Sequence, residues 1–107
     1  MLEEDMFEYE KLIYDWDPNK NEANIKKHGV SFEEARAVFG DTNALFYRDV
    51  EHSFEEERFF VIGYIKKLKH LTVFYCERES EKIIRIISAR KANKKEKNLY
   101  GGNLEWE

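Results

Sequence analysis

The period of apolar and polar positions changes along this chain near residue 43. Residues 7–16 mix aromatic, aliphatic and acidic side chains in partial alternation, which predicts a first strand. Beyond residue 43, aromatic and β-branched residues form short runs separated by charged or polar breaks, a pattern typical of strands. These runs predict four further strands, arranged as a meander, over residues 44–48, 58–65, 71–78 and 83–90.

Two helices are predicted between the first strand and this meander. Asp17 and Pro18 favour the start of the first helix, because Asp is a good N-cap and Pro at the first helical position loses no hydrogen bond. Gly29 ends it after His28, since glycine readily adopts the left-handed conformation that stops a helix. The first helix is therefore expected over residues 18–28.

The second helix begins at Ser31, which can form a capping box with Glu34, and its apolar stripe stops at Gly40. A third helix, basic and short, is expected over residues 91–100, with Asn93 as its cap. The predicted order is β-α-α-β-β-β-β-α. This order indicates an α+β fold with a mainly antiparallel sheet, two N-terminal helices and a C-terminal basic helix.

Length and apolar pattern indicate one domain. A chain of 107 residues supports one modest core. The domain is expected over residues 1–107, with 1–12 as an acidic extension and 101–107 as a frayed tail. In the runs 58–65 and 83–90, apolar residues occupy both odd and even positions, which point to opposite faces of a strand. This predicts that both faces of these strands are covered and that the strands lie centrally in the sheet.

Composition limits the expected cellular compartment and the expected metal and cofactor chemistry. The one cysteine, Cys76, cannot form a disulfide within the chain, so a reducing compartment is expected. The acidic start MLEEDMFEYE is unlike a signal peptide and no apolar run approaches the ~20 residues of a membrane helix, which predicts a cytoplasmic protein. His28, His52 and His70 lack ligand spacing, so no metal site and no cofactor are predicted.

The charges of the chain are segregated. The net charge is −4, and acids gather in residues 3–10 and 49–57. In residues 82–97 every charged residue except Glu96 is basic. Two interpretations stay open for this run. Its residues form a solvated face, or they offer phosphate a positive surface, because acids beyond a Debye length of about 8 Å are screened. The basic residues of this run are Lys82, Arg85, Arg90, Lys91, Lys94, Lys95 and Lys97.

Four polar residues of the first predicted helix, Lys20, Asn24, Lys27 and His28, lie three or four apart and share one face. One interpretation is a phosphate-facing surface on which the imidazole of His28 transfers a proton near neutral pH. The other is an ordinary helix end, where cations meet the negative end of the helix dipole. These residues alone do not decide between the two interpretations.

Arg85 stands among isoleucines in the last predicted strand, and Arg90 follows five residues later. Residues five apart point to opposite faces of a regular strand, so one pocket holds both only if the strand bulges or ends near Ala89. The alternative is structural, with Arg85 paired to an acid such as Glu77 on the neighbouring strand. Cross-strand charge pairing is equally open to Arg58, Glu77 and Arg78.

Several of these residues occur in one order, with others between them, over residues 14–100. They are Trp16, Asp17, Lys20, Asn24, Lys27, His28, Gly29, Val30, Phe32 and Ala35, then Arg58, Ile62, Gly63, Val73, Tyr75, Glu77 and Arg78, and then the run RIISAR from Arg85 to Arg90, Ala92 and Glu96. This set resembles the BrnT family of ribonuclease toxins from type II toxin-antitoxin systems, small proteins with a RelE-like fold.

The resemblance implies a metal-independent endoribonuclease that inhibits growth and translation and is blocked by a cognate antitoxin with a DNA-binding domain. A homodimer, or a heterotetramer with the antitoxin, is compatible with it. Three features depart from the family pattern, namely the acidic extension, Cys76 where threonine is expected, and residues 66–70 in place of a hairpin turn with glycine. They bear on the fit to the partner more than on the chemistry.

RNA cleavage without a metal needs a base for the 2'-hydroxyl, cations for the phosphorane and an acid for the leaving oxygen. Together with the resemblance, this implies that Arg85 and Arg90 bind phosphate. His28 is expected to transfer a proton, Lys27 to stabilise substrate or transition-state charge, and Glu77 is the alternative base. Tyr75 or Tyr64 is expected to stack on a base or donate a proton. The expected RNA-binding residues are Lys20, Asn24, Arg58, Tyr75, Arg78, Lys94 and Lys95.

Two other classes of function stay open from the sequence. A non-catalytic module of the same fold would bind RNA with an affinity that falls with salt, and would give no cleavage products. A protein that acts through the acidic segment 49–57 as an interaction surface would have no affinity for RNA.

Overall fold

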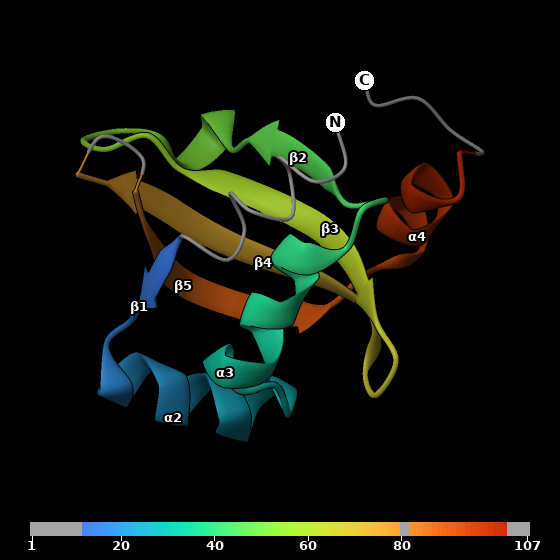
Figure 1. Cartoon of the computed structure of the whole chain (residues 1–107), viewed down its shortest axis with the longest axis horizontal. Helices are drawn as coiled ribbons and strands as arrows, with labels where there is room; N and C mark the ends of the chain where they lie inside the picture. Colours follow the sequence, from blue (N-terminus) through green and yellow to red (C-terminus); the bar gives the residue numbers. More distant parts are fainter. Residues whose placement is uncertain (1–11, 80–81, 103–107) are drawn as a thin grey trace.

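Short helices and a single sheet make up the computed structural model, which describes residues 12–79 and 82–102 (Figure 1). The α+β class predicted from the sequence is confirmed. In chain order the elements are β1 (Ile13–Asp15), α2 (Pro18–His28), α3 (Phe32–Ala35), the 3-10 helix η1 (Arg36–Gly40), β2 (Leu45–Arg48), the 3-10 helix η2 (Val50–His52), β3 (Phe59–Ile65), β4 (Lys69–Arg78), β5 (Ile83–Lys91) and α4 (Lys94–Tyr100).

The predicted first strand is longer than the observed one. It was expected over residues 7–16, and β1 covers three residues, Ile13–Asp15. Residues 7–11 lie outside the described part of the chain, as do most of the acidic extension 1–12 and most of the tail 101–107.

Helix ends follow the predicted capping residues. Asp17 caps α2 with its side chain, and Gly29 ends it with a φ of 72°, in the left-handed region. Ser31 and Glu34 form the predicted capping box of α3. Two boundaries differ from prediction, because α3 tightens into η1 and because β5 extends to Lys91, which delays the start of α4.

Five strands form one sheet in the order β1-β5-β4-β3-β2 (Figure 1). The strands from β2 to β5 form the predicted antiparallel meander, and β1 adds to β5 as a parallel strand. The central strand is β4. The prediction that residues 58–65 and 83–90 lie centrally is therefore right only in that neither segment is an edge strand.

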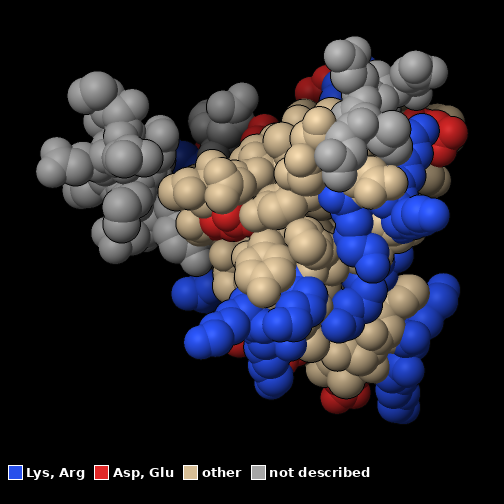
Figure 2. Space-filling model, turned by 90° about the vertical axis from the view of Figure 1, so that its right-hand side faces the viewer, with Lys and Arg blue, Asp and Glu red and all other residues tan. Residues whose placement is uncertain are grey.

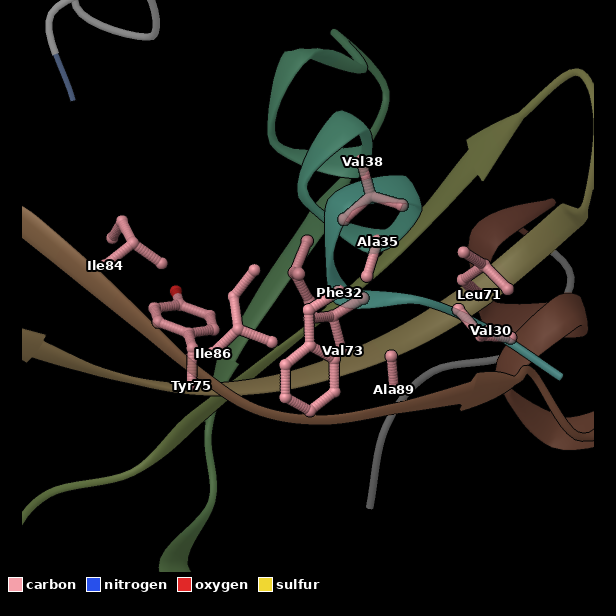
Figure 3. Close-up of a cluster of buried hydrophobic side chains, with 11 residues drawn as sticks. Val30, Phe32, Ala35, Val38, Leu71, Val73, Tyr75, Ile84, Ile86 and Ala89 are labelled. Carbon is pink, nitrogen blue, oxygen red and sulfur yellow. The ribbon is translucent and has the colours of Figure 1, made fainter. Parts of the chain in front are cut away.

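One face of the sheet packs against α3 and η1, and we call it the helix face (Figure 3). Burial of its apolar side chains supplies the main driving force for folding. Gly63 lies directly beneath η1, where a Cβ would come within 2.8 Å of the Cβ of Val38, so glycine permits this close packing. The buried cluster comprises Val30, Phe32, Ala35, Val38, Val61, Leu71, Val73, Tyr75, Ile84, Ile86 and Ala89.

The opposite face of the sheet, which carries Phe60, Ile62 and Cys76, is covered by α4 at one end. We call it the pocket face. Leu99 of α4 packs on Phe60 and Ile62 in a second, smaller cluster, and Figure 1 shows α4 at one side of the sheet only. The other end of the pocket face is not covered by α4 (Figure 1).

A bulge in β5 decides which of its side chains share the pocket face. Ile87 has no partner on β4, because consecutive β4 residues pair with Ile86 and Ser88. One extra residue shifts the alternation of side chains by one position. Arg85 and Arg90 therefore lie on the same face, which is the condition that the sequence analysis set for a joint role.

The outer edge of β5 is completed by a side chain. β1 pairs with β5 only as far as Arg85. Beyond it, Asn24 Nδ2 donates to Ala89 O at 2.8 Å and to Val30 O at 2.9 Å, and Asn24 Oδ1 accepts from Ala89 N at 3.2 Å. A carboxamide offers the same donor and acceptor as a peptide group, so it replaces a neighbouring strand and fixes α2 along β5.

We expect Asn24→Ala to lower the free energy of unfolding by about 3 kcal/mol, because it leaves three buried backbone groups without partners. The control is Asn19→Ala, the same change at an exposed position of α2, for which we expect a change below about 0.5 kcal/mol. Urea unfolding followed by circular dichroism measures both. Equal losses in the two variants would contradict the role of Asn24 at the edge.

Candidate functional site

A pocket occupies the uncovered end of the pocket face, beside the N-terminal end of α2. Four of its lining residues are cationic and two are carboxylates. This excess of positive charge suits an anionic ligand. The lining residues are Asp17, Lys20, Glu56, Arg58, Cys76, Arg78, Arg85, Ile86 and Ile87.

The register of the strands sets Asp49, Arg58, Cys76 and Arg85 in a row across the pocket face. Asp49 N donates to Arg58 O at 2.7 Å, which continues the β2–β3 ladder by one residue. The β3–β4 register, extended by one residue, brings Arg58 opposite Cys76, and Cys76 pairs with Arg85. Arg58 and Arg85 are thus two strand spacings apart, about 10 Å between backbones, a gap that two arginine side chains can close around one phosphate.

Two arginines of the pocket have carboxylate partners. Arg78 Nε lies 2.6 Å from Glu56 Oε2, and its second nitrogen donates to Glu56 Oε1 at 3.0 Å. Arg85 Nη1 lies 3.4 Å from Oδ1 of Asp15 on β1. The structural alternative expected Arg85 to pair with an acid on a neighbouring strand, such as Glu77. The acid is Asp15 on β1 and not Glu77, because Glu77 pairs with Ile84 and points to the helix face.

Arg58 has hydrogen-bonding capacity that the described part of the chain does not satisfy. Its Nε is buried and has no hydrogen-bond partner there, and no ion pair joins Arg58 to a described acid. A buried donor without an acceptor is destabilising. The planar guanidinium matches phosphate geometry, and Arg58, Arg85 and Lys20 all line the pocket, so an anion there would meet positive charge from three separate segments of the chain.

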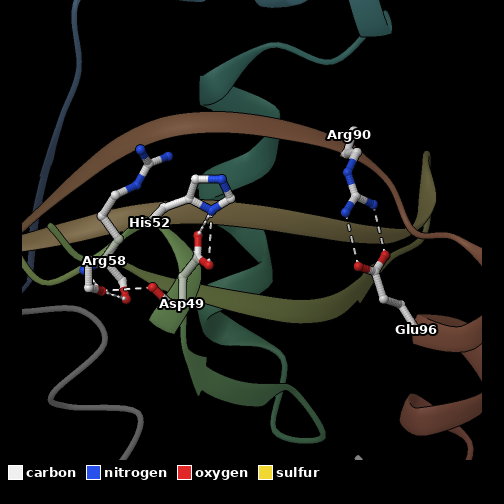
Figure 4. A network of polar contacts seen from close by, with 6 residues as sticks. Asp49, His52, Arg58, Arg90 and Glu96 are labelled. Atoms are coloured by element: carbon white, nitrogen blue, oxygen red, sulfur yellow. Dashed lines mark hydrogen bonds and ion pairs between the residues drawn. The ribbon is translucent and has the colours of Figure 1, made fainter.

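Arg90 shares the pocket face but is bound to α4. Its two terminal nitrogens donate to Glu96 Oε1 at 2.8 Å and Oε2 at 3.0 Å (Figure 4), and its guanidinium lies 5.4 Å from the centre of the Phe74 ring. Thr72 Oγ1 donates to the same carboxylate at 2.7 Å. This network fastens α4 to β4 and β5, so the geometry gives Arg90 a structural contact in place of the expected phosphate.

Asn24, Tyr75 and Glu77 are among the predicted site residues that lie away from the pocket. Asn24 is buried at the edge of β5, with its carboxamide engaged by backbone. Tyr75 is 4% exposed in the core of the helix face, where burial first, and then the charge of Glu77, raise its pKa and keep the hydroxyl protonated. Glu77 lies on the helix face as well. The sheet separates Tyr75 and Glu77 from a ligand in the pocket.

Lys27 and His28 lie in the last turn of α2, with Lys27 exposed and His28 partly buried. Eight residues separate His28 from Lys20, which corresponds to about 12 Å along a helix. Lys20 lines the pocket and His28 does not. The two predicted binding residues therefore stand at different ends of α2.

Exposed lysines gather at one end of the molecule, which we call the basic end. The β3–β4 hairpin and the end of β5 meet there, since Lys91 Nζ donates to Leu68 O at 2.9 Å and Ala92 N donates to His70 O at 3.0 Å. Figure 2 views this side, and Lys and Arg predominate over Asp and Glu on its lower part. The exposed lysines of these elements, of α4 and of the end of α2 are Lys26, Lys27, Lys66, Lys67, Lys69, Lys91, Lys94, Lys95 and Lys97.

The described residues include neither a metal-ligand cluster nor a membrane-spanning helix. No group of three or more His, Cys, Asp or Glu residues in this part of the chain could hold a metal ion. None of its helices is both long and apolar enough to span a bilayer. The absence of a metal site and of a cofactor stays a prediction.

Comparison with known proteins identifies the family. A family model described as the ribonuclease toxin BrnT of type II toxin-antitoxin systems matches residues 16–96, a range that includes every lining residue of the pocket. The chain belongs to the BrnT family. Among solved structures it is similar to the Brucella abortus ribonuclease toxin BrnT, with a TM-score of 0.58 and 22% identity, over 78% of this chain and 99% of that chain. This likeness shows the BrnT fold. No curated protein matches the chain.

Beside Arg58, this BrnT-family protein carries an Asp–His pair that the sequence analysis did not single out. His52 Nδ1 lies 3.1 Å and 3.0 Å from the two carboxylate oxygens of Asp49, which is 7% exposed (Figure 4). Ser53 Oγ donates to Asp49 O at 2.7 Å and accepts from Arg58 N at 2.9 Å. The three-residue spacing of Asp49 and His52 was the available signal, and it is too common in sequences to indicate a pair.

Glu96 links α4 to the pocket face through its charge. Burial alone would raise the pKa of its carboxyl, but hydrogen bonds from Arg90, from the backbone of Asn93 and from Thr72 outweigh burial and lower the pKa. A group whose pKa is lowered by folding stabilises the folded state as long as it is ionised. The attachment of α4 should therefore weaken in acid.

We expect Glu96→Gln to lower the free energy of unfolding by about 2 kcal/mol at pH 7, since it removes a charge-assisted contact. The wild-type advantage is full above the usual Glu pKa of 4.5 and is lost as the pH falls through the lowered pKa of the folded state. Urea unfolding between about pH 3 and pH 7 measures this, with Glu33→Gln, an exposed glutamate, as control. A Glu96→Gln deficit that is equal across this range would contradict the charge-based role.

Proposed function

We propose that this protein is an endoribonuclease that cleaves RNA without a metal ion, inhibits translation and growth, and is neutralised by a cognate antitoxin in the cytoplasm. Two facts support the proposal. The chain belongs to a family of ribonuclease toxins, and its pocket sets Arg58, whose Nε has no described partner, two strands from Arg85. RNA is a polyanion, so such a pocket suits one of its phosphates. We also propose that the fold is RelE-like.

In the proposed reaction, the pocket cations stabilise charge that develops on the phosphate. Arg58 and Arg85 donate to its non-bridging oxygens from opposite sides, and Lys20 adds positive charge at the rim. These contacts strengthen as the phosphorane gains negative charge, so they lower the barrier more than they tighten binding. Arg78, held by Glu56, also lines the pocket.

RNA beyond the scissile phosphate would follow α2 toward the basic end. Lys27 and His28 at the end of α2, with Lys94 and Lys95 at the start of α4, then contact neighbouring nucleotides. Proton transfer by His28 or Glu77 stays a prediction, which their positions do not favour. His28 lies one helix length from Lys20, and Glu77 lies behind the sheet.

A type II toxin family implies an antitoxin as partner. We propose that this antitoxin carries a DNA-binding domain and that the toxin forms a homodimer or a heterotetramer with it. The second candidate function is a non-catalytic RNA-binding module of the same fold. It is favoured by one observation, namely that neither His28 nor Glu77 lies in the pocket.

The first experiment is cleavage of a long single-stranded RNA in excess EDTA by the wild type and by Arg58→Ala. We expect the wild type to cut, and Arg58→Ala to be about a hundredfold lower in kcat/KM, because one transition-state donor is lost. The control is Arg36→Ala, an exposed arginine paired with Glu33 on the other side of the sheet, which should stay within about twofold. RNA affinity that falls with salt, without any cutting by the wild type, would favour the non-catalytic module.

A second experiment separates the two interpretations of His28. From its distance to the pocket we expect folded His28→Ala to raise KM by up to about tenfold while kcat stays within about twofold, the pattern of a lost binding contact. Steady-state cleavage kinetics with folding checked by circular dichroism measures this. A fall in kcat of about a hundredfold or more would instead assign proton transfer to His28.

A further inference from the structure

We propose that His52 is the general base of RNA cleavage at this pocket and that Asp49 is its positioning residue. The inference rests on the proposed endoribonuclease function and supplies the proton-transfer group that the lining of the pocket lacks. It is carried by the juxtaposition, in one loop, of a buried carboxylate, an exposed imidazole and Arg58, whose Nε has no partner in the described part of the chain.

The loop between β2 and β3 fixes His52 next to Arg58. Asp49 and Arg58 are joined by a backbone hydrogen bond of 2.7 Å, and Ser53 Oγ contacts the backbone of both. Asp49 is also the end of the row that continues through Arg58 and Cys76 to Arg85. Figure 4 shows the Arg58 guanidinium and the His52 ring on the same side of the β3 ribbon, facing β4 and β5. His52 is not itself a lining residue of the pocket, but a phosphate held by Arg58 would lie on the side of the sheet where the His52 ring stands (Figure 4).

The Asp49 carboxylate sets the orientation of the imidazole. Asp49 is 7% exposed and its carboxylate has one side-chain partner in the described chain, His52 Nδ1. A buried carboxylate accepts a hydrogen bond strongly, so we assign the imidazole proton to Nδ1, which leaves the lone pair on Nε2 free. Once Nε2 takes a proton, the same carboxylate stabilises the imidazolium. This is the division of labour of an Asp–His pair in a catalytic triad.

A purely structural role for His52 explains less of the arrangement. The loop is already held by Ser53, whose hydroxyl bonds to the backbone of Asp49 and Arg58. The side chain of His52 is 55% exposed, so it buries little apolar surface. An apolar residue at position 49 would avoid burying a carboxylate altogether. Burying the Asp49 carboxylate therefore destabilises the fold, and a role in proton transfer would explain why it is kept.

Nε2 of His52 removes the proton of a ribose 2'-hydroxyl while the 2'-oxygen forms a bond to the phosphorus held by Arg58 and Arg85. The bond between phosphorus and the 5'-oxygen breaks, and the 5'-oxygen takes a proton from water. The products are a 2',3'-cyclic phosphate and a 5'-hydroxyl, and the imidazolium of His52 returns its proton to solvent. No metal, oxidant or reductant takes part.

The test is a pair of substitutions at His52, assayed on single-stranded RNA in excess EDTA. His52→Asn keeps a donor for Asp49 but has no second nitrogen, so we expect kcat to fall about 10²- to 10⁴-fold with little change in KM. In His52→Ala, added imidazole should restore part of kcat, whereas it should not restore Arg58→Ala. Asp49→Asn should lower kcat at least about tenfold without that rescue. His70→Asn, where the ring packs between Tyr64 and Tyr100, is the matched control and should stay within about twofold.

Each outcome bears on a separate claim. If the wild type cuts and folded His52→Asn cuts equally well, His52 is no base and the inference is overturned, while the proposed function stands. If the wild type does not cut, the proposed function and the inference both fail. If His52→Ala does not fold, by circular dichroism, His52→Asn decides alone, since it keeps the hydrogen bond to Asp49. Loss of kcat with imidazole rescue supports the inference.

Discussion

The carboxamide of Asn24 determines how the helical half of the chain sits on the sheet. It bonds to both backbone groups of Ala89 and to the carbonyl of Val30, so one side chain joins α2, the chain that leads to α3, and the last strand. A helix beside an open strand edge has no preferred register, because the edge offers identical groups at every second residue. With Asn24 engaged, Lys20 is set against the bulge of β5, at the pocket.

The two ends of the pocket face serve different purposes because of how their charges are paired. At one end, Arg90 forms an ion pair with Glu96, and the resulting network holds α4 over Phe60 and Ile62. At the other end, α4 does not cover the sheet, and the Nε of Arg58 has no partner among residues 12–79 and 82–102. The face thus combines an end where the arginine is anchored with an end where four cations line a pocket.

Much of the fold could be predicted from interactions between residues close in sequence. The contacts between distant segments could not. Asp17, Gly29 and the Ser31 capping box act within a few residues, so their effects could be recognised in the sequence. The roles of Asn24 and of Asp15 beside Arg85 depend on strand pairing across more than sixty residues of chain. In the candidate site, single cations were foreseeable, whereas their division into anchored and unpaired ones was a matter of geometry.

The bulge at Ile87 has a consequence for how the segment from Arg85 to Arg90 can change over evolution. Both arginines reach the pocket face because one residue between them is left out of the pairing. A change of side chain in this stretch alters packing only locally. Gain or loss of a single residue would turn one arginine to the helix face and detach either Asp15 or Glu96 from its partner. The length of this stretch is therefore more strictly constrained than the side chains between the two arginines.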